Sequence, residues 1–277
     1  MHHPAEGSSD EAMERIQTAL LKAKRKSPPL WIADRTSVVS PVATDVHWGA
    51  LPAYLPDTAA LTASRVVTLG RTDPAHGAFD MVRTRLLQYL RQNGWTSVAV
   101  TSPREGCGKS LVALNLAFSL SHQKECRTAL VDLDLRRPRI ARALGIRKSM
   151  SMESFLKRQS GVADAFLRHG NNLALGVNSQ SVRLPAELLQ SADAAEALRN
   201  IKQTLKPDVI IYDLPPMLAT DDVAAFLPNV DCVILVVAAE ESTFSEIDLC
   251  ERELSQRSNV VGVVFNKCRY APEIHGY

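Results

Sequence analysis

The feature that most constrains this chain is the stretch SVAVTSPREGCGKS at residues 97–110, where an apolar strand runs into a loop that ends in Gly-Lys-Ser. A strand, a glycine-containing loop and a helix start, in that order, bring backbone N–H groups onto one anion, and Lys109 adds a mobile positive charge. Gly106 and Gly108 allow close approach of the backbone. The strict G-x-x-x-x-G-K-[ST] pattern is not met, because Pro103 occupies its first glycine position. The stretch predicts a nucleotide-phosphate loop, and the alternative is an ordinary strand–turn–helix corner.

Two further apolar runs end in carboxylates. The run RTALVDLD at residues 127–134 ends with Asp132 and Asp134, and the run DVIIYDLPP at residues 208–216 contains Asp213. In a parallel sheet the carboxyl ends of strands lie along one edge, where ligands bind. A single aspartate at a strand end is commonly a turn or cap residue. Three of them downstream of a phosphate loop favour a magnesium–nucleotide site.

The remaining pattern predicts an α/β fold with a doubly wound, mostly parallel sheet. The predicted strands are continuous Val/Ile/Leu runs, as in a sheet covered on both faces, and helices separate them. These strands are expected at residues 97–101, 128–133, 173–177, 209–212, 231–237 and 260–265. A helix over residues 74–92 precedes them and is expected to stop at Gly94.

The first 63 residues differ from the rest of the chain. Residues 11–26 have apolar positions at helical spacing, with acidic residues early and basic ones late, so they predict a helical extension. Its basic end is expected to be a solvated helix terminus, and the alternatives are contact with anionic lipid, a partner or the core. Residues 27–63 contain several prolines and are expected to form a linker. The nucleotide-binding domain is therefore expected over residues 64–277.

Composition excludes several classes of protein. The formal net charge of +2 is too balanced for non-specific nucleic-acid binding. The five cysteines are scattered without metal-like spacing and are expected to be reduced thiols. The longest apolar runs are far shorter than the ~18–20 residues that span a bilayer, and the N-terminus does not read as a secretory signal. We therefore expect a cytoplasmic protein that would be peripheral to a membrane only through a partner.

At this point the chain resembles the bacterial tyrosine kinases of capsule and exopolysaccharide synthesis, a branch of the deviant-Walker, SIMIBI-like P-loop ATPases. DLDLRRP at residues 132–138 is similar to their Walker A′ motif, and YDLPP at residues 212–216 is similar to their Walker B motif. PAELL at residues 185–189 and VGVVFNK at residues 261–267 match further segments of the family. The resemblance covers about residues 70–268, with its motifs in the right order.

The resemblance implies ATP and Mg²⁺ as cofactors and a role for each site residue. Lys109 would bridge phosphates, Asp132 would be the base toward an incoming hydroxyl, and Asp134 would assist the metal. The implied metal ligands are Ser110, Asp132 and Asp213. The implied nucleotide contacts are Glu105, Gly106, Cys107, Gly108, Lys109, Ser110, Leu111 and Asn266. Arg136 is expected to contribute to catalysis, whereas the neighbouring Arg137, Arg139 and Arg142 are expected to be solvated.

Several positions depart from the family or stay open. Glu105 and Cys107 replace two residues of the family's loop, and Arg104 stands where the partition and septum-positioning ATPases carry a signature lysine. Gly77 and Asp80 replace a Glu and an Arg of the family's ring-forming helix. Only Arg83 of that trio remains, so the substitutions speak against ring assembly as the family does it. We expect self-association, as a dimer or a ring. Asp221 and Asp222 are either anchors of metal-bound water or cap residues of a helix.

The chain ends RYAPEIHGY, so Tyr270 and Tyr277 are the candidate phosphate acceptors in place of the family's tyrosine cluster. Three functions remain open at this stage. The first is a tyrosine autokinase that controls polysaccharide polymerisation and export, activated by an inner-membrane chain-length regulator. The second is an ATPase switch whose nucleotide-dependent dimerisation controls a membrane partner. The third is a nucleotide-binding scaffold without catalysis.

Overall fold

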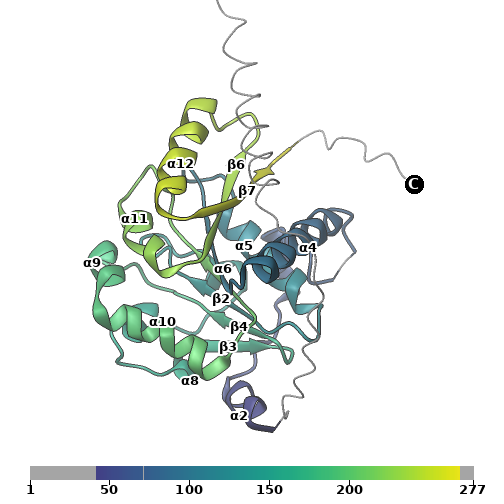
Figure 1. Ribbon diagram of the computed structural model, residues 1–277. Coiled ribbons are helices and arrows are strands. Elements are labelled where there is room, and N and C mark those ends of the chain that lie inside the picture. The colour runs from purple at the N-terminus through teal and green to yellow at the C-terminus, as the bar shows by residue number, and fades with distance from the viewer. Residues whose placement is uncertain (1–41, 71, 269–277) are drawn as a thin grey trace, which may run out of the picture. The chain divides into compact units, whose positions relative to one another are not determined.

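The computed structural model describes residues 42–70 and 72–268, which form an α/β unit around one sheet (Figure 1). In this part of the chain the sheet has seven strands in the order β3-β4-β2-β5-β1-β6-β7. The strands are β1 Ser97–Thr101, β2 Thr128–Asp132, β3 Phe166–His169, β4 Leu173–Gly176, β5 Val209–Asp213, β6 Cys232–Ala238 and β7 Asn259–Asn266. All neighbours pair in parallel except β3 and β4. The doubly wound, mostly parallel sheet predicted from the sequence is confirmed.

Helices cover both faces of this sheet. The longer ones are α4 His76–Asn93, α5 Lys109–Ser121, α10 Ala192–Leu205 and α12 Phe244–Arg257. The shorter ones are α2 Val42–Ala50, α3 Thr58–Ala63, α6 Ile140–Ala143, α7 Met152–Leu156, α8 Val162–Ala165, α9 Pro185–Gln190, α11 Asp222–Phe226 and the 3₁₀ turn η1 Leu227–Asn229. The stop predicted for α4 is confirmed, since Gly94 adopts the left-handed conformation with φ of 68°.

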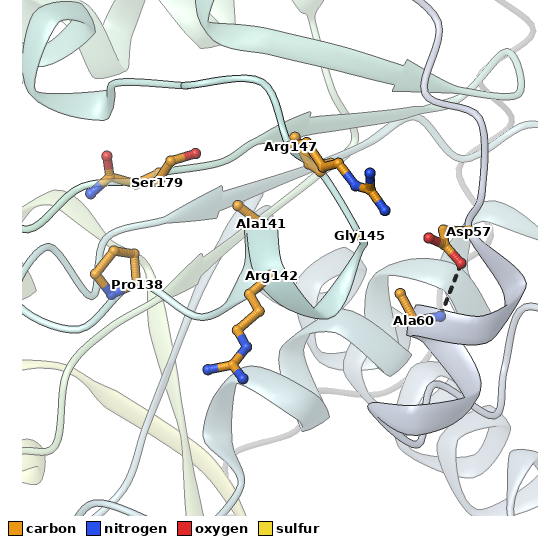
Figure 2. A pocket seen from close by; sticks show the side chains of 10 residues that line it. Asp57, Ala60, Pro138, Ala141, Arg142, Gly145, Arg147 and Ser179 are labelled. Carbon is orange, nitrogen blue, oxygen red and sulfur yellow. Dashed lines mark hydrogen bonds between the residues drawn. The ribbon is translucent and has the colours of Figure 1, made fainter.

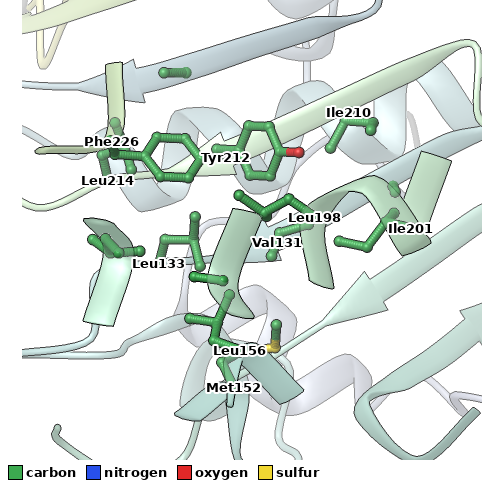
Figure 3. Packing of buried hydrophobic residues seen from close by; sticks show 14 of the residues in the cluster. Val131, Leu133, Met152, Leu156, Leu198, Ile201, Ile210, Tyr212, Leu214 and Phe226 are labelled. Carbon is green, nitrogen blue, oxygen red and sulfur yellow. The ribbon is translucent and has the colours of Figure 1, made fainter. Parts of the chain in front are cut away.

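The core divides into two apolar clusters, one on each face of the sheet. Residues of α3, α4, α5 and α6 make one cluster, and residues of α2 and of α7 to α12 make the other. Alternate residues of one strand enter the two clusters, as Ile210 and Ile211 of β5 do. Figure 3 shows the second cluster, where Tyr212 of β5 lies against Phe226 of α11 with ring centroids 4.9 Å apart. Both strand faces are therefore buried, which explains their near-continuous apolar sequences.

Residues 42–63, expected as part of a linker, contain two helices that pack on the core. Trp48 of α2 is 2% exposed, and its indole N–H donates to the carbonyl of Leu205 at 2.8 Å. The hydroxyl of Tyr54 donates to the carbonyl of Leu144 at 2.8 Å. Ala53 forms an isolated parallel bridge with Arg168 on β3, which partly covers that edge of the sheet. Residues 42–63 accordingly belong to the compact unit, and the predicted helix over residues 11–26 lies outside the described residues.

No helix within residues 42–70 and 72–268 combines the length and the apolar character needed to cross a bilayer.

Candidate functional site

The phosphate loop connects β1 to α5 and has the conformation that its glycines allow. Gly106 and Gly108 have φ values of 89° and 91°, in the left-handed region that favours glycine. A Cβ atom on Gly108 would overlap Nδ2 of Asn266, whereas a Cβ on Gly106 would meet nothing within 4 Å. Of these two glycines, Gly108 is therefore the one at which the loop lies too close to β7 for a side chain.

Asn266 lies at the end of β7 and holds the phosphate loop from the side. Its Nδ2 donates to the carbonyl oxygen of Cys107 at 2.9 Å. The thiol of Cys107 lies 3.6 Å from the hydroxyl of Ser242, in the turn after β6. The sequence predicted a nucleotide contact for Asn266, and the structure adds a contact with the loop itself. No feature of the sequence indicated that second contact.

The loop is also joined to the segment after β5. Thr101 donates to the carbonyl of Pro215 at 2.7 Å, and the N–H of Met217 donates to the carbonyl of Ser102 at 2.8 Å. The N–H of Leu133 donates to the carbonyl of Asp213 at 2.9 Å. These bonds bring the carboxyl ends of β1, β2 and β5 together, as expected for parallel strands.

Lys109 stands at the centre of this edge. Its Nζ lies 2.6 Å from Oδ2 of Asp134, 3.7 Å from Oδ1 of Asp213 and 3.2 Å from Oγ of Ser110. The side chain is 8% exposed. Burial alone would lower the pKa of Lys109, but the carboxylates of Asp213 and Asp134 raise it. The lysine is therefore charged and is already bound to carboxylates of its own chain.

Asp132 and Asp213 are paired positions of the neighbouring strands β2 and β5, and both are completely buried. Neither oxygen of either carboxylate has a hydrogen-bond partner among the described residues. Burial, followed by the charge of Asp213, raises the pKa of Asp132 well above its usual range. Burial also raises the pKa of Asp213 to about 6, against the opposing effect of Lys109.

These residues fit a magnesium ion with bound phosphates. Three buried carboxylates share one lysine, so negative charge is in excess, and two of the carboxylates lack hydrogen-bond donors. Mg²⁺ is commonly held by one or two carboxylates together with phosphate oxygens and water. Within the described residues, no group of three or more His, Cys, Asp or Glu side chains is arranged to hold a metal ion by itself. Ser110, Asp132 and Asp213 are the residues that could contribute to a shared site.

The other residues predicted for the site lie around this centre. Arg136 contacts the start of α11, where the carboxylate of Asp222 accepts two hydrogen bonds from its guanidinium, at 2.7 and 2.9 Å. Asp222 therefore has a role that the sequence did not indicate, and the cap of α11 is the backbone of Asp221 without a side-chain bond. Leu111, the second residue after Lys109, is partly buried and packs on the α5 side of the core. Tyr270 and Tyr277 lie outside the described residues.

The tip of the loop is bound on both sides by charged groups. Nε of Arg104 lies 2.8 Å from Oε1 of Glu246 at the start of α12, and its guanidinium also donates to the carbonyl of Glu241. Glu105 accepts from Arg137 and Arg139, which follow the Walker A′ strand. Arg137 and Arg139, expected to be solvated, are exposed but carry this ion pair. Exposed ion pairs of this kind contribute little to stability, so they orient the tip more than they stabilise it.

The helix that resembles the family's ring-forming segment, α4, uses its arginine internally. Nη1 of Arg83 lies 2.6 Å from Oδ1 of Asp80 and donates to the carbonyl and hydroxyl oxygens of Ser119 on α5. Arg83 is therefore committed to contacts within its own chain.

A separate hollow of about 390 Å³ lies between the start of α3, α6 and the loop after β4 (Figure 2). Asp57, Arg142, Arg147 and Ser179 are among its lining residues. In Figure 2 the side chains of Arg142 and Arg147 extend in different directions. None of the residues around Lys109 lines this hollow, so it is distinct from the candidate site.

Comparison with known proteins gives a consistent result. Residues 95–273 match the family described as "ParA: NUBPL iron-transfer P-loop NTPase". The chain is 28% identical over 199 residues to "Putative tyrosine-protein kinase EpsB" of Ralstonia solanacearum, which covers 70% of this chain and 26% of that protein. The chain thus spans about a quarter of the length of this relative.

A shorter relative is matched over most of its length. The chain is 31% identical over 178 residues to "Tyrosine-protein kinase CpsD" of Streptococcus pneumoniae serotype 4, which covers 61% of this chain and 75% of that protein. Among solved structures, the kinase domain of the Escherichia coli tyrosine kinase ETK superposes with a TM-score of 0.66 at 23% identity. That match covers 76% of this chain and 84% of the other, and it shows a common fold.

Proposed function

Because the chain belongs to the bacterial tyrosine kinases within the ParA-type P-loop NTPases, we propose that it is an ATP-dependent protein-tyrosine autokinase with Tyr270 and Tyr277 as its phosphate acceptors. The observation that carries this proposal is the position of Lys109 among three buried carboxylates at the joint end of β1, β2 and β5. Phosphoryl transfer depends on positioning and on charge neutralisation more than on covalent chemistry of the protein.

We assign each site residue a role in phosphoryl transfer from its position in the site. Mg-ATP, when bound, would supply the phosphoryl group, and its Mg²⁺ ion would supply additional positive charge. Ser110 and Asp213 would hold the ion, and the backbone of residues 105–111 would surround the phosphates. Asp132 would accept the proton of the tyrosine hydroxyl, and its raised pKa suits a general base.

Asp134 prepares Lys109 for the phosphates. The 2.6 Å contact fixes the ammonium group beside the loop before a nucleotide arrives. Incoming phosphates would compete with Asp134 for the same charge, so the lysine can change partners without losing its position near the loop. Binding of Mg²⁺ near Asp213 would compensate the carboxylates that the lysine leaves.

The wider role that we propose is control of exopolysaccharide or capsule polymerisation and export. The resemblance of the Walker A′ and Walker B segments to kinases of polysaccharide synthesis supports it, as do relatives named as tyrosine-protein kinases. The proposed partner is an inner-membrane chain-length regulator that activates the kinase, and self-association would bring a tail from one subunit to the site of another.

Transfer from labelled Mg-ATP tests the proposal directly. The wild-type chain, Lys109→Met and Tyr270→Phe/Tyr277→Phe would be compared, each with and without the cytoplasmic segment of the proposed activator. We expect label on tyrosine in the wild type and its loss in both variants. The double tyrosine variant is the matched control, since it retains the whole nucleotide site.

A second function is favoured by the sparse tyrosines and by Arg104 at the loop tip. In that case the chain is an ATPase switch, and phosphate would be released without labelled protein. Such release, lost in Lys109→Met and kept in the tyrosine variant, would replace the kinase proposal with the switch. Nucleotide binding without either product would indicate a scaffold.

A further inference from the structure

The best-defined ion pair outside the Lys109 cluster joins Arg136 to Asp222. Nε and Nη2 of Arg136 donate to Oδ2 and Oδ1 of Asp222 at 2.7 and 2.9 Å, which is the bidentate geometry that guanidinium and carboxylate favour. The contact links the segment after β2 to the helix that follows β5. These two segments adjoin Asp134 and Asp213 of the candidate site.

Asp222 is held in place by the packing of its own helix. Val223 and Phe226 of α11 are completely buried, and the ring of Phe226 lies against Tyr212, the residue before Asp213. The side chain of Asp222 is 1% exposed, whereas that of Arg136 is 40% exposed. The carboxylate of Asp222 is therefore the fixed member of the pair, and it orients the guanidinium of Arg136.

The pair leaves part of the guanidinium available. Arg has five N–H donors, and Asp222 uses the Nε and Nη2 sides, so the Nη1 side keeps its two donors. The hydrogen bonds that Arg136 donates to Asp222 raise the pKa of Arg136, so the group keeps its positive charge. A second carboxylate, that of Asp221, lies 4.0 Å from Nη2 but is 78% exposed, so it adds little orientation.

We propose that Asp222 is a positioning residue that aims Arg136 at the transferred phosphoryl group. Asp222 binds the Nε and Nη2 side of the guanidinium. The Nη1 side is thereby left for the phosphoryl group, on a residue that follows Asp134 of the candidate site by two positions. This inference rests on the proposed phosphoryl transfer, and it assigns to Asp222 neither metal binding nor helix capping.

The test is a double-mutant cycle in the full chain, with Mg-ATP turnover, the KM for ATP and thermal stability measured for each protein. The variants are Asp222→Asn, Arg136→Gln and the combination of both. Asp221→Asn is the matched control, because it removes the same charge one residue away without breaking the bidentate contact. Should Arg136→Gln fail to fold, Arg136→Lys replaces it, since lysine keeps the charge but not the two-pronged geometry.

We expect Asp222→Asn and Arg136→Gln each to lower kcat by about tenfold or more, with the KM for ATP changed by less than about threefold. The combined variant should be no slower than Arg136→Gln alone, because Asp222 acts through the arginine. Arg136→Gln should also lower the melting temperature by leaving the Asp222 carboxylate buried and unpaired, and Asp222→Asn should restore it without restoring kcat. Asp221→Asn should remain within about twofold of the wild type.

A folded Asp222→Asn protein with wild-type kcat would overturn the inference, as would losses in kcat that add in the combined variant. A rate that follows the melting temperature through the series would also overturn it, since that is the behaviour of a structural contact. Absence of any turnover in the wild type, with the cytoplasmic segment of the proposed activator present, has a different meaning: it would refute the proposed function, and the positioning role with it.

Discussion

The ammonium group of Lys109 lies 2.6 Å from the carboxylate of Asp134, at the edge of the sheet where β1, β2 and β5 end together. The lysine of the phosphate loop is thus bound to its own chain. Because Asp132 and Asp213 are buried beside it without hydrogen bonds, Lys109 compensates only part of the charge. The carboxylates that the proposed function needs at this edge therefore lower the stability of the metal-free protein.

Removal of the lysine should separate these two properties. Lys109→Met should abolish turnover and should lower the free energy of unfolding by about 3–5 kcal/mol in magnesium-free buffer, because it removes the ion-pair partner of the buried Asp134 carboxylate. Urea unfolding with a chelator measures the stability. The control is Lys109→Met/Asp134→Asn, which should recover much of the stability and none of the activity. Unchanged stability in Lys109→Met would contradict this interpretation of the pair.

Removal of the Asp213 carboxylate should raise the stability of the metal-free protein, whereas removal of Lys109 lowers it. Burial raises the pKa of Asp213 from 3.8 to about 6, so the folded protein binds this proton more tightly than the unfolded chain does. Its contribution to stability therefore falls as pH rises from about 4 to about 6 and stays low above that range. Asp213→Asn should stabilise the metal-free protein by about 1–3 kcal/mol at pH 8, with little effect near pH 4, while turnover is lost.

Urea unfolding of both proteins at the two pH values, with a chelator present, checks this prediction. The difference between wild type and variant is the quantity to compare, since it cancels the other titrating groups. An Asp213→Asn protein that is less stable than the wild type at pH 8 would be inconsistent with a buried carboxylate that has no hydrogen-bond donor.

The contact between Gly108 and Asn266 predicts different results for two glycines of one loop. Both glycines have φ near 90°, but only at Gly108 would a Cβ overlap Asn266. Gly108→Ala should cost about 1–3 kcal/mol more than Gly106→Ala and should weaken ATP binding more. Thermal unfolding and ATP titration of the two variants measure the difference. Equal effects would show that φ strain alone decides, and Gly108→Ala/Asn266→Ala tests whether the overlap is relieved.

Because the helices of residues 42–63 pack on the core, we expect this segment to unfold together with the nucleotide-binding domain. Trp48 is buried, donates to the carbonyl of Leu205, and has the guanidinium of Arg127 5.5 Å from its ring centroid. Trp48→Ala should therefore cost about 3–5 kcal/mol in urea unfolding, and Trp48→Phe clearly less. ATP affinity of the folded protein should stay unchanged, because Trp48 lies at the amino-terminal end of the strands. A loss below about 1 kcal/mol would mean that the segment is only loosely attached.

Sequence alone predicted the strands that are long and buried on both faces. Their near-continuous apolar runs and the carboxylates at their ends allowed β1, β2 and β5 to be located to within about one residue. The short antiparallel strand Phe166–His169 was not predicted, because four residues show no period that separates a strand from a turn. The two helices within residues 42–63 were missed because prolines suggested a linker, whereas burial of Trp48, Tyr54 and Leu61 decides the outcome.

The candidate site, too, could be predicted from the sequence only in part. The residues that come together around Lys109 were predicted, since parallel strands bring their carboxyl ends to one edge. Contacts that depend on side-chain direction were not predicted, such as Arg136 with Asp222 and Asn266 with the carbonyl of Cys107. Both partners of such a contact come from segments far apart in the chain, and no local pattern records their distance.

The central claim is that Lys109 and the buried carboxylates form a magnesium–nucleotide site, and calorimetric titration with ATP tests it most directly. Wild type, Lys109→Met and Asp132→Asn/Asp213→Asn would be titrated with Mg²⁺ present and with Mg²⁺ removed by a chelator. We predict ATP binding by the wild type that weakens by about tenfold or more without Mg²⁺, a similar loss in Lys109→Met, and no Mg²⁺ effect in the carboxylate variant. The claim would be contradicted if the wild type bound ATP equally well with and without Mg²⁺ and if both variants bound ATP with the wild-type affinity.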